Sequence, residues 1–112
     1  MIVNPRGFTI TLTLADTSYK LSDLIFIVDP DIQGHHLQVQ RLTLQADFNA
    51  GGTRFYVGNS DLTGTNRGVE LVATQVVLYE APYSPPELLH LEQIYVRANA
   101  AGKMMNVFIQ WP

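Results

Sequence analysis

The stretch FTITLTL, from Phe8 to Leu14, indicates what kind of fold this chain adopts. Its apolar residues alternate strictly with threonines, so every second side chain points to the same side of an extended backbone. Threonine is β-branched and favours strands, and here it makes the second side polar. We therefore predict a β-strand with one buried face and one exposed face.

Further strands are predicted on the same grounds between segments that contain Gly, Pro, Asn or Asp. They cover residues 24–28, 36–47, 54–57, 69–71, 76–79, 93–98 and 104–111, with one helical turn at 87–91. Within 36–47 the apolar positions change parity at Gln40-Arg41, which predicts a bulge or a strand that bends from one sheet to another. In the last strand, Met104 and Phe108 lie on the face opposite to that of Met105.

The order of these segments predicts the fold class: an all-β, antiparallel β-sandwich or jelly roll of about eight strands. Residues 1–112 contain no linker, repeat or low-complexity tract, so we predict a single domain with a short N-terminal arm at residues 1–7. In that arm, Ile2 and Val3 are apolar and Pro5 favours an extended backbone that reaches a neighbour. A frayed chain end is the alternative.

The charge content is low. Charged residues make up 15% of the chain, against about 25% in ordinary soluble domains. A surface poor in charge is typical of a protein that is partly covered by another protein, because interface cores are depleted in charged residues. The alternative is a compact monomer whose exterior is rich in Thr, Gln and Asn.

Composition also argues against several partners. The net charge is −3 and the seven Lys and Arg residues are scattered singly, so we expect no nucleic-acid partner. There is no apolar run of membrane-spanning length and the first residues do not resemble a signal peptide, so we expect no membrane partner. The absence of cysteine removes disulfides and thiolate zinc sites and suits synthesis in a reducing cytoplasm.

No catalytic or metal-binding pattern stands out. His35 and His36 are adjacent, so in an extended segment their side chains would point to opposite faces, and His90 follows two leucines. No nucleophile elbow, zincin or P-loop motif occurs, and most aspartates sit at expected turns. We therefore predict that the protein is not an enzyme and has no catalytic residues, no metal and no cofactor. We expect Trp111 to belong to the core.

A long connection follows the strand at residues 54–57 and reads GNSDLTGTNRG from Gly58 to Gly68. We expect Gly58 to leave the strand with unusual backbone angles. Polar side chains such as those of Asn59, Asp61 and Asn66 are expected to bond to nearby backbone groups. The loop is then a connector, and any further role is a contact with a neighbouring subunit rather than with a small molecule.

Several segments, taken in order, carry a resemblance to a known family. They are LTLQAD (Leu42–Asp47), FYVGNSD (Phe55–Asp61), GTNRGVEL (Gly64–Leu71), LEQIYVRA (Leu91–Ala98), AGK (Ala101–Lys103) and VFI (Val107–Ile109). This succession resembles the small jelly-roll capsid decoration or cement proteins, the head accessory proteins of tailed bacteriophages. Arg67, between Asn66 and Gly68, is an insertion relative to the family pattern.

The resemblance implies a structural virion protein on the outer surface of the phage head, made in the host cytoplasm, that stabilises contacts between major capsid subunits. The implied partner is the major capsid protein, and edge strands and uncharged faces favour a homo-oligomer, a dimer or trimer. The alternative is a tail or fibre jelly-roll module that binds a receptor or carbohydrate, with Tyr83 beside Asp61 and Asn66. The candidate interface residues are Ile2, Val3, Pro5, Phe26, Asn59, Asp61, Asn66, Arg67, Tyr83, Met104 and Phe108.

Overall fold

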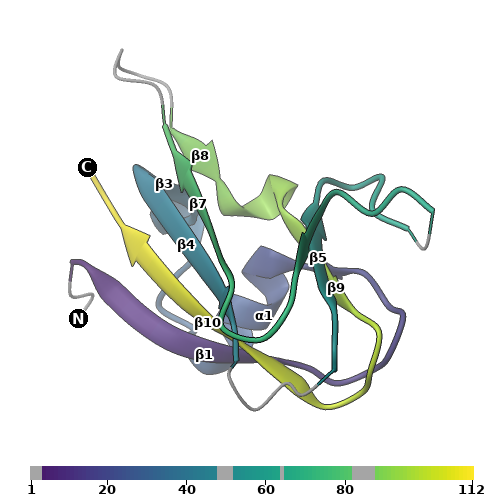
Figure 1. Ribbon diagram of the computed structural model, residues 1–112. Coiled ribbons are helices and arrows are strands. Elements are labelled where there is room, and N and C mark those ends of the chain that lie inside the picture. The colour runs from purple at the N-terminus through teal and green to yellow at the C-terminus, as the bar shows by residue number, and fades with distance from the viewer. Residues whose placement is uncertain (1–3, 48–51, 64, 82–87) are drawn as a thin grey trace.

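A computed structural model describes residues 4–47, 52–63, 65–81 and 88–112 (Figure 1). Within these ranges, no helix has the length and apolar character needed to cross a membrane. The elements, in chain order, are β1 (Arg6–Leu12), β2 (Tyr19–Lys20), α1 (Leu21–Val28), the 3₁₀ helix η1 (Gly34–Leu37), β3 (Gln38–Val39), β4 (Arg41–Ala46), β5 (Phe55–Gly58), β6 (Val69–Leu71), β7 (Val76–Glu80), β8 (Leu89–His90), the 3₁₀ helix η3 (Leu91–Gln93), β9 (Tyr95–Ala98) and β10 (Lys103–Gln110).

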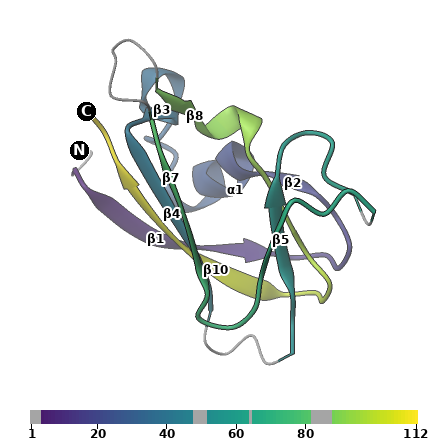
Figure 2. The same cartoon turned by 45° about the horizontal axis from the view of Figure 1, so that its top comes forward.

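The strands form two four-stranded sheets and one short pair. Sheet A has the order β1-β10-β4-β7, sheet B has the order β2-β9-β5-β6, and β3 pairs with β8. Every pairing is antiparallel. Figures 1 and 2 show sheet A on one side, β5 and β9 of sheet B on the other, and α1 behind them. The prediction of a mostly β, antiparallel fold is confirmed.

The alternation of apolar residues with threonines from Phe8 onward agrees with the pairing of β1 with β10. Ile10 is paired with Met105 and Phe8 with Val107, and Ile10 and Met105 are fully buried. The buried cluster takes side chains from both sheets, among them Leu44 of sheet A and Phe55 of sheet B. The period of two thus places the apolar side of each sheet toward a common core.

Of the two alternatives predicted at Gln40-Arg41, a bulge or a bend from one sheet to another, the bend is confirmed. Val39 belongs to the β3–β8 pair, whereas Leu42 belongs to β4 of sheet A. Both side chains are fully buried although they are three positions apart, because the backbone bends between the two strands. The bend reverses the parity of the buried positions.

The strand predicted at residues 24–28 is wrong, because these residues end helix α1. Leu21, Leu24 and Ile25 are buried in α1, at the spacing of one helical face. The predicted segment begins at residue 24 and leaves out Leu21, so it does not show this helical face. Three exposed apolar residues, Phe26, Ile27 and Val28, gave the segment its two-sided apolar appearance.

Two smaller predictions also differ from the structure. The helical turn expected at 87–91 is displaced: Leu89–His90 is strand β8 and the 3₁₀ turn is Leu91–Gln93. The first strand ends at Leu12, and Leu14 beyond it is 60% exposed. In both places the pairing partner sets the boundary, since β8 pairs with β3 and β1 ends where it leaves β10.

Asn4, the first described residue, lies beside Trp111 near the other end of the chain. Asn4 Nδ2 donates to the Trp111 carbonyl at 3.2 Å and Asn4 Oδ1 accepts from the Trp111 amide at 3.0 Å. Arg6 pairs with the buried Asp29 at 2.7 Å. Residues 4–7 of the predicted arm are therefore held against the domain, with Arg6 and Gly7 in β1, while Ile2 and Val3 lie outside the described residues.

Candidate functional surfaces

The outer side of sheet A carries no ionisable side chain in its two middle rows. Arg41 and Glu80 lie at one end, and Asp47, whose amide donates to the Met104 carbonyl, lies at the other. We call this outer side the uncharged face. The register places its members in rows across β1, β10, β4 and β7. They are Gly7, Thr9, Thr11, Thr43, Gln45, Val76, Leu78, Met104, Asn106 and Phe108.

Large apolar side chains are exposed on the uncharged face. Phe108 is 43% exposed, Leu78 52%, Val76 51% and Met104 40%. Phe108 is opposite Thr43, which is opposite Leu78, so the aromatic ring and the leucine flank a threonine in one row. A shallow depression of about 460 Å³ lies on this face, with Phe108 and Val76 among its lining residues.

Three polar side chains of the uncharged face are linked by hydrogen bonds. Thr9 Oγ1 donates to Asn106 Oδ1 at 3.0 Å, and Asn106 Nδ2 donates to Gln45 Oε1 at 3.5 Å. Gln45 Nε2 then donates to the Thr74 carbonyl at 3.3 Å. This chain of bonds crosses three strands. Since burial of a polar group is costly when its hydrogen bond is lost, these three side chains can be dehydrated at lower cost than unpaired ones.

The outer side of sheet B is different in character. Asp16, Arg54, Tyr56, Arg67, Arg97 and Asn99 line a hollow of about 320 Å³ there, which we call the arginine pocket. The sheet register creates it, because Tyr56 of β5 is opposite Arg97 of β9 on one side and Glu70 of β6 on the other. Tyr56 is only 7% exposed.

Each arginine of the pocket has a different setting. Arg54 Nη1 pairs with Glu70 Oε1 at 2.8 Å, and this hydrogen bond and the charge of Glu70 raise the pKa of Arg54 above its ordinary value. The Arg67 guanidinium carbon lies 5.5 Å from the centre of the Tyr56 ring, within the range of a cation–π contact. Arg97 is 17% exposed and lies 3.9 Å from Asp16 Oδ1, too far for a hydrogen bond.

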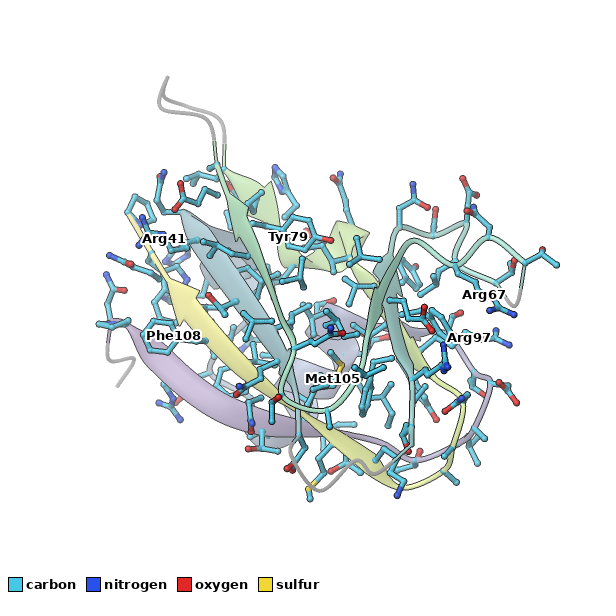
Figure 3. The ribbon with its side chains drawn as sticks, in the orientation of Figure 1. Arg41, Arg67, Tyr79, Arg97, Met105 and Phe108 are labelled. Carbon is cyan, nitrogen blue, oxygen red and sulfur yellow. The ribbon has the colours of Figure 1, made fainter. Side chains whose placement is uncertain are left out.

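Figure 3 places these surfaces on opposite sides of the molecule. Phe108 lies on the left side, Arg67 and Arg97 lie on the right, and Met105 lies between them. The end of the uncharged face is marked by Arg41, whose guanidinium pairs with Glu80 at 3.0 Å.

The connection between β5 and β6 is held by its own side chains, as predicted. Asn59 Oδ1 accepts from the Asp61 amide at 2.9 Å, and Asn66 Nδ2 donates to the Asp61 carbonyl at 3.1 Å. Thr63 Oγ1 accepts from the Asn66 amide at 3.0 Å. Leu62 is buried and anchors the loop to the domain. These bonds order the segment that precedes Arg67.

Among the described glycines of this loop, Gly68 rather than Gly58 has unusual backbone angles. Gly68 has a φ of +62°, and a Cβ at this position would lie 2.2 Å from the Val57 carbonyl oxygen. Gly58 has no positive φ; it lies in β5. Left-handed backbone is therefore needed where the loop re-enters the sheet, not where it leaves.

The histidine and tryptophan predictions have mixed outcomes. His35 and His36 belong to η1, and their ring centres are 4.0 Å apart, so the prediction of opposite faces is wrong. A 3₁₀ helix turns neighbouring residues through less than the extended chain does. Trp111 packs against the core, as predicted, and its Nε1 donates to the His36 carbonyl at 2.9 Å. Among the described residues, no three His, Cys, Asp or Glu side chains are grouped to hold a metal.

The predicted interface residues are spread over separate surfaces. Met104 and Phe108 lie on the uncharged face, Phe26 lies on α1, and Pro5 is exposed just before β1. The loop contains Asn59, Asp61, Asn66 and Arg67, all exposed, while Tyr83 lies outside the described residues.

Sequence reasoning missed several residues of these surfaces, among them Val76, Leu78, Arg54 and Arg97. Val76 and Leu78 had a usable signal, because the run VVLY is apolar on both parities and one of them must face outward. No sequence signal marked Arg54 and Arg97, since each is a single charge in its own segment.

A scan of the sequence against protein-family models finds no match, and a search of curated proteins finds no significant similarity. The function is therefore inferred from the geometry of these surfaces and from the resemblance seen in the sequence.

Proposed function

We propose that this protein is a capsid decoration protein, which binds the outer surface of a bacteriophage head and stabilises contacts between major capsid subunits. The observation that carries the proposal is the uncharged face, with four exposed apolar side chains on one sheet and polar groups that bond to one another. The resemblance of the chain from Leu42 to Ile109 to small phage head proteins supports it.

We also infer that the two large sheets form a jelly roll. With β3 and β8 set aside, the remaining strands, numbered one to eight along the chain, have the orders 1-8-3-6 and 2-7-4-5. This order supports the inference because a jelly roll combines two Greek keys in two sheets.

The mechanism is structural. Seating the uncharged face on the shell removes Phe108, Leu78 and Val76 from water, at about 25 cal/mol per Å² of apolar surface buried. Little desolvation opposes this, because Thr9, Asn106 and Gln45 already have hydrogen-bond partners. A dimer or trimer would engage several capsid subunits at once, so modest individual contacts would combine into durable attachment.

The test is co-sedimentation of the purified protein with shells assembled from the major capsid protein of the same virus and lacking accessory proteins. We expect binding at micromolar concentration. The double variant Phe108→Thr with Leu78→Thr keeps strand-forming residues but removes two of the four exposed apolar side chains. It should bind about tenfold more weakly or worse.

The matched control is Leu14→Thr, which removes an apolar side chain that is even more exposed but lies outside the sheet, and it should bind like the wild type. A wild-type protein that stays in the supernatant would contradict the proposal, as would a double variant that sediments normally. Glycan binding without shell binding would favour the tail or fibre role instead.

A further inference from the structure

The arginine pocket gathers a large share of the positive charge of the chain. Arg54, Arg67 and Arg97 are three of its five arginines, and they come from three separate segments. The protein as a whole has a net charge of −3. A local cluster of guanidinium groups on an acidic protein is an electrostatic feature that needs a physical explanation.

The carboxylates near the pocket leave it positively charged. Glu70 pairs with Arg54, and Asp16 lies near Arg97. Among the residues that line the pocket together with Glu70, three guanidinium groups and two carboxylates give a formal charge of +1. One added monoanion neutralises the pocket, whereas a dianion such as hydrogen phosphate would bring a surplus negative charge beside Asp16 and Glu70.

The donors in the pocket are suited to a carboxylate. Arg97 has a largely buried side chain, and its contact with Asp16 at 3.9 Å is longer than a hydrogen bond. Asn99 Oδ1 accepts from the Arg54 amide at 2.9 Å, which leaves the hydrogens of Asn99 Nδ2 for another acceptor. A planar guanidinium can bind both oxygens of a carboxylate in parallel.

The floor and size of the pocket limit what it can hold. Tyr56 forms a nearly buried base, and Arg67 lies against its ring. A volume of about 320 Å³ is at the lower end of the range for small-molecule sites. It suits the end of one side chain better than an entire cofactor.

We propose that the arginine pocket binds the carboxylate of an acidic side chain on a partner protein. This binding site is on the opposite side of the molecule from the uncharged face, and the proposal does not depend on the role at the phage head. The two faces would let one molecule contact two different protein surfaces.

The experiment is an NMR titration of the ¹⁵N-labelled protein at constant ionic strength and pH 7.5. The probes are the peptide acetyl-Ala-Glu-Ala-amide, its neutral analogue acetyl-Ala-Gln-Ala-amide, and inorganic phosphate. We expect the Glu peptide to shift the amide signals of Arg54, Tyr56 and Arg97 in a saturable manner, and the Gln peptide to leave them unchanged.

Variants locate the binding. Arg97→Gln should weaken binding of the Glu peptide about tenfold or more, because a hydrogen bond to a charged group is lost. Arg67→Gln, in an exposed loop position, should weaken it as well and serves if the first variant does not fold. Arg41→Gln removes a matched arginine from the end of the other sheet and should change the affinity less than about twofold.

Three results would overturn the proposal. They are equal shifts with the Glu and Gln peptides, no saturable shift with the Glu peptide, and equal affinity for the Glu peptide in wild type and both pocket variants. Tighter binding of phosphate than of the Glu peptide would also overturn it, by assigning the pocket to phosphate.

Discussion

The outer sides of the two sheets differ in how they would bind a partner. The uncharged face of sheet A exposes apolar side chains between polar groups that bond to one another. The arginine pocket of sheet B concentrates guanidinium groups around a buried tyrosine. The first is suited to burial over a broad area and the second to one directional, charged contact. The same fold thus presents two kinds of recognition on opposite sides.

The largest expected effect is a loss of stability when Gly68, just before β6 of sheet B, is replaced. Gly68→Ala places a Cβ 2.2 Å from the Val57 carbonyl oxygen in left-handed backbone. It should lower the free energy of unfolding by more than about 2 kcal/mol, measured by urea denaturation. Since Gly68 follows Arg67, NMR shift changes in the variant should be concentrated in sheet B and the arginine pocket.

The control for this prediction is Gly102→Ala. Gly102 has nearly the same φ, +67°, but no atom lies within 4 Å of its added Cβ. Only the backbone strain of about 1 kcal/mol should remain. Equal losses in the two variants would show that the contact with Val57 is not what requires glycine.

Salt should affect binding at the two faces differently. Raising sodium chloride from 50 to 500 mM screens exposed charges. We expect the Glu peptide to bind several-fold more weakly at the higher salt, while co-sedimentation with shells through the uncharged face stays the same or increases. A parallel loss in both assays would mean that charge governs both surfaces.

A smaller effect is expected when one negative charge is removed beside the pocket. Glu70→Gln takes away the partner of Arg54 and raises the local formal charge. The Glu peptide should then bind about two- to threefold more tightly in the same titration. Glu80→Gln, which removes the partner of Arg41 at the end of the uncharged face, should leave the affinity unchanged.

The smallest expected effect at neutral pH is the effect on stability of replacing Tyr79, which lies behind the uncharged face. Tyr79 is on the inner side of β7, opposite Leu42, and burial raises its pKa above the ordinary value of 10.0. The unfolded chain therefore loses the phenol proton at a lower pH than the folded protein does. The resulting stability is present below about pH 10 and is lost as the pH rises through the folded pKa.

Tyr79→Phe removes this titration. Relative to the variant, the wild type should lose stability in unfolding experiments at pH 11 but not at pH 7. An identical pH dependence of the two proteins between pH 9 and pH 11 would show that Tyr79 is equally hydrated in the folded and unfolded states.

The sequence by itself determined the properties that depend on neighbouring positions. The alternation from Phe8 to Leu12 and from Met104 to Ile109 defined strands, and it assigned Met104 and Phe108 to an outer side. The polar loop after β5 was also predictable, because Asn59 and Thr63 bond to backbone groups two or three residues away. Period and short-range hydrogen bonding are properties of a contiguous segment, so they can be read without knowing the fold.

Only the tertiary structure decided which residues from distant parts of the sequence become neighbours. Helix α1 formed because Leu21, Leu24 and Ile25 reach one core from one face, although residues 24–28 alone are equally compatible with a strand. The arginine pocket exists because β5 pairs with β9, which brings Tyr56 opposite Arg97 although they are 41 positions apart in the sequence. Such pairings are set by the burial of all apolar faces at once, and no local pattern records them.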